Sequence, residues 1–124
     1  MIIARDFHYD SAHYLIGVPD THKCSRMHGH TYRLTVMVEG EVDQRGFVMD
    51  FADVDAAVKP AIKMLDHRVL NEVDKPNLEN PTVENQLIWL WDRLSPSLPL
   101  KELILWEGLN NYGRYTGGAP ALHG

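Results

Sequence analysis

Two histidines and the only cysteine of the chain lie within the segment CSRMHGH, which spans residues 24–30. Apolar and polar residues alternate from His28 onward, and this pattern predicts a β-strand with His28 and His30 on one face. Imidazoles roughly 7 Å apart along one strand face can converge on a shared ion. The segment therefore predicts a metal site that needs at least one further ligand.

A third histidine ends the first predicted strand, which covers residues 2–13. If that strand pairs with the strand beginning at His28, the imidazole of His13 joins the other two. Three histidines and an open position form the ligand set of catalytic zinc sites, although imidazole also suits nickel, copper and iron. We therefore expect Zn²⁺ at His13, His28 and His30. Three further histidines have no such partners in the pattern and are expected to have no metal role: His8, His22 and His123.

The role of Cys24 stays open on spacing alone. The thiol could be a fourth ligand, which would close the site and make it structural. It could be a small buried apolar residue, or a base or nucleophile beside the metal, whose charge favours the thiolate. Spacing does not separate these three roles, although it favours the ligand.

Two further strands and two helices are expected to position these residues. A turn at EGEVDQRG precedes a short return strand at FVMDF, which would complete a hairpin with the second strand. One helix follows the predicted cap Asp50, and because Pro60 lies inside its pattern we expect a kink or an irregular first half. The next helix begins at NPT, with Asn80 or Thr82 as its cap, and KELILWE forms the last long strand.

The element order predicts an α+β fold with an antiparallel sheet, and a short extra strand is expected around residues 112–115. Trp89 falls outside the apolar stripe of the second helix, which predicts either a single exposed residue or a subunit contact. A small open sheet leaves strand edges that oligomerisation often covers.

Composition limits the class of protein. A chain of 124 residues favours one domain, 1–124, and a net charge of −5 gives no broad basic surface for nucleic acid or an acidic membrane. The sequence has no apolar run near the ~20 residues of a membrane span, and its first residues lack a signal-peptide layout. A single cysteine cannot form an internal disulfide, so we expect a cytoplasmic protein.

Six motifs occur in order over nearly the whole chain: FHYDSAH, KCSRMHGH, GFVMDF, LDHRVLN, NPTVEN and the carboxylate of LILWEG. Together they resemble the 6-pyruvoyltetrahydropterin synthase / 6-carboxytetrahydropterin synthase family. The short spacing from the cysteine to His-Gly-His is most similar to the 6-carboxytetrahydropterin synthase members of queuosine biosynthesis. The resemblance implies a tunnelling fold, with two helices on one face of the sheet. It also implies a homo-hexamer of two stacked trimers, in which the sheets join into a barrel.

The resemblance also implies a role for each matched residue. These roles are zinc ligands at His13, His28 and His30, a catalytic cysteine at Cys24 rather than a ligand, an Asp-His pair working with it at Asp66 and His67, and a pterin-anchoring carboxylate at Glu107. Two positions depart from the family pattern, because Ser11 replaces a common alanine and Gly108 replaces a common threonine.

The implied reaction is the zinc-dependent conversion of 7,8-dihydroneopterin triphosphate to 6-carboxy-5,6,7,8-tetrahydropterin, acetaldehyde and triphosphate. Two alternatives remain, a synthase that only eliminates triphosphate and a non-enzymatic zinc module with Cys24 as fourth ligand. Without the resemblance, Asp66 and His67 would be interpreted as a polar helix end and Glu107 as a solvated strand end.

Overall fold

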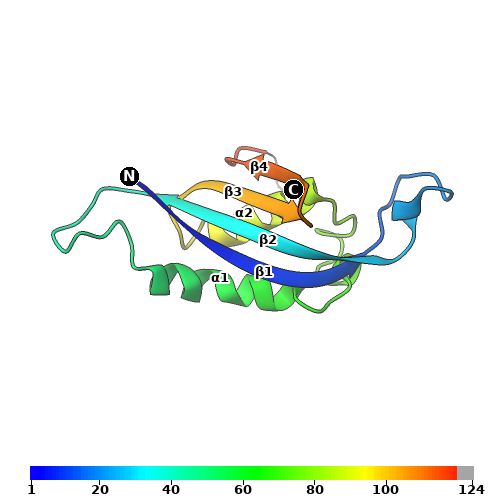
Figure 1. Ribbon diagram of the computed structural model, residues 1–124, viewed down its shortest axis with the longest axis horizontal. Coiled ribbons are helices and arrows are strands. Elements are labelled where there is room, and N and C mark those ends of the chain that lie inside the picture. Colours follow the sequence, from blue (N-terminus) through cyan, green and yellow to red (C-terminus); the bar gives the residue numbers. More distant parts are fainter. Residues whose placement is uncertain (120–124) are drawn as a thin grey trace.

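The computed structural model describes residues 1–119, so His123 lies outside the described residues. It contains strands β1 (Ile2–His13), β2 (His28–Glu39), β3 (Leu100–Glu107) and β4 (Asn111–Tyr115), helices α1 (Phe51–Leu65) and α2 (Val83–Leu94), and short 3-10 turns η1 (Lys23–Ser25) and η2 (Leu70–Glu72). The strands form one antiparallel sheet in the order β1-β2-β3-β4, with both helices against one of its faces (Figure 1). The predicted α+β class is confirmed.

The buried face of the sheet follows from the period-2 alternation of its strands. Phe7 and Tyr9 of β1 lie opposite Leu34 and Tyr32 of β2, and all four side chains are buried against the helices. Ser11, His13, His28 and His30 share this parity, so they continue the same face of the sheet toward the end of the β1–β2 pair. The alternation that builds the core therefore also sets which way the histidines point.

Side-chain caps define where both helices begin. The Asp50 carboxylate accepts a hydrogen bond from the N–H of Ala52 at 2.9 Å, and the Thr82 hydroxyl accepts one from Asn85 at 3.0 Å. Asp50 and Thr82 are thus the N-caps of α1 and α2, as the sequence predicts. Helix α1 runs without interruption through Pro60, so the expected irregular first half does not occur.

The predicted return strand at FVMDF is wrong. Residues 47–50 form no strand and include bends at Val48 and Met49, and α1 begins at Phe51. Strand β2 has β1 on one side and β3 on the other, so no edge of β2 is free for a return strand. Two strands consequently precede the helices in place of three. Two strands follow the helices, because the short extra strand expected around residues 112–115 is present as β4.

The prediction that Trp89 is exposed or forms a subunit contact is also wrong. Its side chain is 4% exposed, and the indole Nε1–H donates to Asp74 Oδ2 at 2.9 Å. The guanidinium of Arg93 stacks 4.5 Å from the ring centroid and covers its outer side. A hydrogen-bonding partner and an arginine thus allow α2 to bury an aromatic outside its apolar stripe.

Among residues 1–119, none of the helices has the length and apolar character needed to cross a membrane.

Candidate functional site

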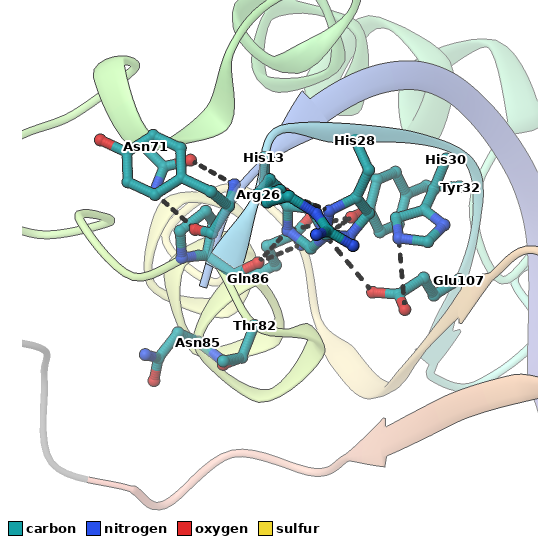
Figure 2. Close-up of polar contacts among 12 residues, drawn as sticks. His13, Arg26, His28, His30, Tyr32, Asn71, Thr82, Asn85, Gln86 and Glu107 are labelled. Carbon is teal, nitrogen blue, oxygen red and sulfur yellow. Dashed lines mark hydrogen bonds and ion pairs between the residues drawn. The ribbon is translucent and has the colours of Figure 1, made fainter. Parts of the chain in front are cut away.

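Three imidazoles meet where β1 ends and β2 begins (Figure 2). His13 pairs directly with His28 across the two strands, and His30 follows two residues later on the same face. Ring centroids lie 4.6 Å apart for His13–His28, 5.1 Å for His13–His30 and 4.8 Å for His28–His30. One ring nitrogen from each residue lies within 4.8 Å of the others, which is the convergence that the sequence predicts.

Hydrogen bonds set the tautomers of two of these rings. His13 Nδ1 lies 2.8 Å from the carbonyl oxygen of Pro81, and His28 Nδ1 lies 2.7 Å from that of Arg26. Because a carbonyl only accepts, a neutral ring must donate from Nδ1 and leave the lone pair on Nε2. His30 Nε2 is buried and has no hydrogen-bond partner within residues 1–119.

The three residues fit a transition-metal ion for these reasons. Burial lowers the pKa of His13 and of His30, which keeps both imidazoles neutral near pH 7 despite the nearby carboxylate of Glu107. Neutral imidazole is the form that binds metal, and carbonyl acceptors on Nδ1 are its usual outer partners. The buried His30 Nε2 has no hydrogen-bond partner and lies near ring nitrogens of His13 and His28. An ion bound by all three residues would satisfy this atom.

A hollow of about 440 Å³ borders this cluster. Its lining includes Lys23, Cys24, Arg26, His28, His30 and Glu107. Glu107 ends β3, and its carboxylate lies 3.5 Å from His30 Nε2 and 4.0 Å from His13 Nε2. Within residues 1–119, Cys24 is not part of the set of mutually close metal-ligating atoms. The structure therefore places Cys24 and Glu107 beside the cluster.

Buried amide contacts hold the loop that carries Cys24. The side chain of Asn71 is wholly buried, accepts from the N–H of Tyr14 at 3.1 Å and donates to the Tyr14 carbonyl at 2.8 Å. Next to this contact, the N–H of Leu15 donates to the carbonyl of Cys24 at 2.7 Å. The sequence prediction missed Asn71, although it ends the motif LDHRVLN, because the motif does not show which backbone it reaches.

The Asp66–His67 pair forms, as expected. Asp66 Oδ1 lies 3.0 Å from His67 Nδ1 and accepts the N–H of Asp10 at 2.9 Å. The Asp10 backbone donor lowers the pKa of Asp66 most, and the hydrogen bond from His67 lowers it further. An ionised Asp66 keeps the ring proton on Nδ1 and leaves Nε2 of His67 facing solvent, since that side chain is 78% exposed.

This pair lies on the other face of the β1–β2 ribbon from the histidine cluster. The ligating atoms of Asp66 and His67 lie near the Asp10 carboxylate, and Asp10 has the parity opposite to that of the cluster residues. His67 borders a second hollow at the edge of β1 that also touches His30 but does not include Cys24. Cys24 borders the first hollow. A single chain therefore brings Cys24 to the histidines and Glu107 but does not bring it to Asp66 and His67.

Both departures from the family pattern have structural reasons. The Ser11 hydroxyl is buried and donates to the Leu65 carbonyl at 2.5 Å, so the extra polar group is paired. Gly108 has φ +67° in the turn after β3, and its N–H donates to Thr31 at 3.0 Å. A threonine would be strained at that φ, so glycine suits the turn as this chain forms it.

Comparisons with known proteins agree with this architecture. The chain matches the family described as 6-pyruvoyl tetrahydropterin synthase over residues 2–118. It is 45% identical over 91 residues to the dihydroneopterin monophosphate aldolase of Pyrococcus furiosus, covering 70% of this chain and 75% of that protein. It is 36% identical over 99 residues to the 6-carboxy-5,6,7,8-tetrahydropterin synthase of Synechocystis sp., covering 75% and 74%. The structure of Caenorhabditis elegans 6-pyruvoyl tetrahydropterin synthase matches with a TM-score of 0.86 at 25% identity, covering 95% of this chain and 96% of that one.

Proposed function

The chain belongs to the 6-pyruvoyl tetrahydropterin synthase family, and from that membership we propose that it is a carbon–carbon lyase acting on a phosphorylated 7,8-dihydropterin. The favoured substrate is 7,8-dihydroneopterin triphosphate, which with water gives 6-carboxy-5,6,7,8-tetrahydropterin, acetaldehyde and triphosphate. This product would serve 7-deazapurine biosynthesis of the queuosine type. The observation that supports the proposal most is the hollow shared by the histidine cluster, the Cys24 thiol and the Glu107 carboxylate.

In this proposal His13, His28 and His30 hold a zinc ion. Bound there, zinc would stabilise the negative charge that develops on the side-chain oxygens of the substrate. Cys24 removes a proton from a hydroxyl-bearing carbon of that side chain, as a positioned base beside the cluster. The mutual closeness of the three imidazoles supports this division of roles, because Cys24 lines the same hollow without belonging to their set.

The second proton-transfer group is proposed to come from a neighbouring copy of the chain. Asp66 and His67 lie on the opposite face of the β1–β2 ribbon from Cys24, so one chain does not assemble all three residues. In an oligomer, His67 of the partner subunit could enter the Cys24 hollow, with its proton held by Asp66 of the partner subunit.

We expect a homo-hexamer for the same reason. Within residues 1–119, β4 has no strand on its outer side, and the outer edge of β1 is covered only near Asp10 and Ala12, where residues 66–69 run beside it. Pairing between copies would cover these edges. Light scattering at micromolar concentration should give a mass of about six chains, as the family resemblance implies. A stable monomer would contradict both the hexamer and the shared site.

Glu107 is proposed to anchor the pterin ring. A carboxylate can accept the two parallel N–H donors of the pyrimidine edge, and Glu107 lies in the hollow with both oxygens near the histidines. Glu107→Gln turns one acceptor into a donor that faces a donor. Loss of a charge-assisted hydrogen bond costs ~1.5–3 kcal/mol, so KM should rise roughly 10-fold to 100-fold.

Steady-state kinetics on zinc-loaded protein would measure this change. Glu102→Gln is the matched control, because Glu102 lies on the same strand but pairs with Arg114, with its Oε1 2.6 Å from the guanidinium Nη2. Glu102→Gln should leave KM unchanged. An unchanged KM for Glu107→Gln at full zinc content would remove the anchoring role.

A second activity is favoured by the 45% identity to a dihydroneopterin monophosphate aldolase. An aldolase would break the same bond between the first two side-chain carbons, without the internal redox step. Dihydroneopterin monophosphate would then give 6-hydroxymethyl-7,8-dihydropterin and glycolaldehyde phosphate. The same base and the same pterin anchor serve both reactions, because each begins with proton removal on the side chain.

One experiment separates these activities. Zinc-loaded protein is incubated in parallel with dihydroneopterin triphosphate and dihydroneopterin monophosphate, and the products are identified by mass spectrometry. A 6-carboxy pterin with acetaldehyde supports the favoured reaction, and a 6-hydroxymethyl pterin from the monophosphate supports the aldolase. A pterin that keeps all three side-chain carbons after triphosphate loss indicates a pyruvoyl-forming synthase. Turnover of neither substrate would favour a structural zinc module.

A further inference from the structure

A buried chain of hydrogen bonds links helix α2 to the first histidine of the cluster. The hydroxyl of Tyr9 donates to Gln86 Oε1 at 2.8 Å, and Gln86 Nε2 donates to the carbonyl of Pro81 at 3.0 Å. The same carbonyl oxygen lies 2.8 Å from His13 Nδ1. Figure 2 shows Gln86 close to His13, on the side of the cluster away from Glu107.

The direction of every bond in this chain follows from the Pro81 carbonyl. A carbonyl oxygen only accepts, and its two lone pairs can take two donors. The Gln86 amide must therefore turn its nitrogen toward Pro81 and its oxygen toward the Tyr9 hydroxyl. For the same reason a neutral His13 must carry its proton on Nδ1, which leaves the lone pair on Nε2.

Burial makes these contacts hard to replace. Gln86 is fully buried, and Tyr9 and His13 are each 1% exposed. Water cannot readily satisfy the amide if one partner is removed, so a broken contact leaves a buried polar group unpaired. Gln86 directly follows the motif NPTVEN and is not among the site residues that the sequence predicts.

His13 has a weaker alternative partner that does not select one tautomer. The Tyr32 hydroxyl lies 3.4 Å from His13 Nδ1 and 3.5 Å from its Nε2. If the Pro81 carbonyl moved away, His13 could donate to Tyr32 from either nitrogen, so the Nδ1–H tautomer that leaves a lone pair on Nε2 would no longer be enforced. Gln86 opposes this change because it fixes the Pro81 carbonyl from the side opposite His13.

We propose that Gln86 is a positioning residue for the metal site, acting through the Pro81 carbonyl to hold His13 as the Nδ1–H tautomer. The inference rests on the proposed metal site and adds a residue to it. Removing an outer partner of a metal-ligating histidine typically costs 10-fold to 100-fold in metal affinity. Gln86→Met keeps a long buried side chain but loses both hydrogen bonds; because the Pro81 carbonyl itself remains, zinc affinity should fall toward the lower end of that range, ~10-fold.

The test is a chelator competition that measures zinc affinity of the full chain, with no substrate present. Trp89→Phe is the matched control, because Trp89 lies on the same helix as Gln86. This substitution also removes one buried hydrogen bond, the one to Asp74. Trp89→Phe should lower thermal stability without weakening zinc binding. Equal loss of zinc affinity in both variants would mean that Gln86 acts only through stability, and would overturn the inference.

A spectroscopic measurement adds a readout that overall stability does not change. In zinc-free protein with ¹⁵N-labelled histidine, His13 should be the Nδ1–H tautomer, and Gln86→Met should add the Nε2–H form. If Gln86→Met fails to fold, Tyr9→Phe replaces it, because it removes only the far partner of Gln86. Tyr9→Phe should give a smaller effect on tautomer and affinity in the same direction.

The outcomes distinguish this inference from the function on which it rests. If the unaltered protein binds no zinc, the metal site and the inference both fail. If it binds zinc tightly and neither Gln86→Met nor Tyr9→Phe changes the affinity or the tautomer, only the role of Gln86 fails. The inference is supported if Gln86→Met weakens zinc binding and changes the His13 tautomer while Trp89→Phe changes neither.

Discussion

Cys24→Ala is expected to keep its zinc and its fold and to lose turnover by ~10²–10⁴-fold, the usual worth of a positioned acid or base. The thiol borders the hollow beside the histidines and lies outside the set of mutually close ligating atoms. Removing it leaves the three imidazoles and their carbonyl partners unchanged. The Cys24 backbone contacts to His22 and Leu15 also remain, so the loop should keep its shape.

Metal content, thermal stability and single-turnover rate should be measured on one preparation of each variant. Cys24→Ser is the matched variant, since it keeps the size of the side chain and a hydrogen-bonding group but is a much weaker acid. It should be nearly as slow as Cys24→Ala. Full turnover in Cys24→Ser would exclude a proton-abstracting thiol, and loss of zinc in Cys24→Ala would make the thiol a ligand and favour the structural zinc module.

The histidine cluster could be predicted from sequence because it depends only on strand period and strand pairing. Alternation places His28 and His30 on one face, and the antiparallel register then sets His13 directly opposite His28. The caps Asp50 and Thr82 were predictable for a similar reason, since each acts within one turn of its own helix.

Features that depend on distant parts of the chain could not be predicted. The FVMDF segment has strand-like composition, but β3 already occupies the edge of β2 that it would need. Trp89 is buried because Asp74 and Arg93 meet it, and neither contact follows from helical spacing. Local propensity gives way to tertiary pairing in both cases.

The outer partners of the metal site were also missed, for a different reason. Pro81 acts through a backbone carbonyl, which every residue possesses and which leaves no trace in the side-chain pattern. The family motif correctly paired Asp66 with His67 but did not show that the pair lies on the other face of the ribbon from Cys24. That placement depends on residues 66–69, which run along the edge of β1.

His30→Ala should release zinc and abolish activity together, and it is the sharpest test of the proposed ligand set. Its Nε2 is buried with no hydrogen-bond partner among residues 1–119 and lies beside the other two imidazoles, 3.5 Å from the Glu107 carboxylate. Loss of an outer partner already costs 10-fold to 100-fold in metal affinity, so loss of a ligand should cost more than ~100-fold. His13→Ala and His28→Ala should behave in the same way.

The matched control is His8→Ala. His8 is exposed on the face of the sheet opposite the cluster, so its removal should leave about one zinc per chain and full turnover. Metal analysis after dialysis gives zinc content, and circular dichroism shows whether each variant is folded. Full zinc occupancy in all three cluster variants would show that the ion binds elsewhere. Loss of zinc from folded His30→Ala with retention in His8→Ala would locate it between β1 and β2, where the pairing of two strands alone brings three imidazoles together.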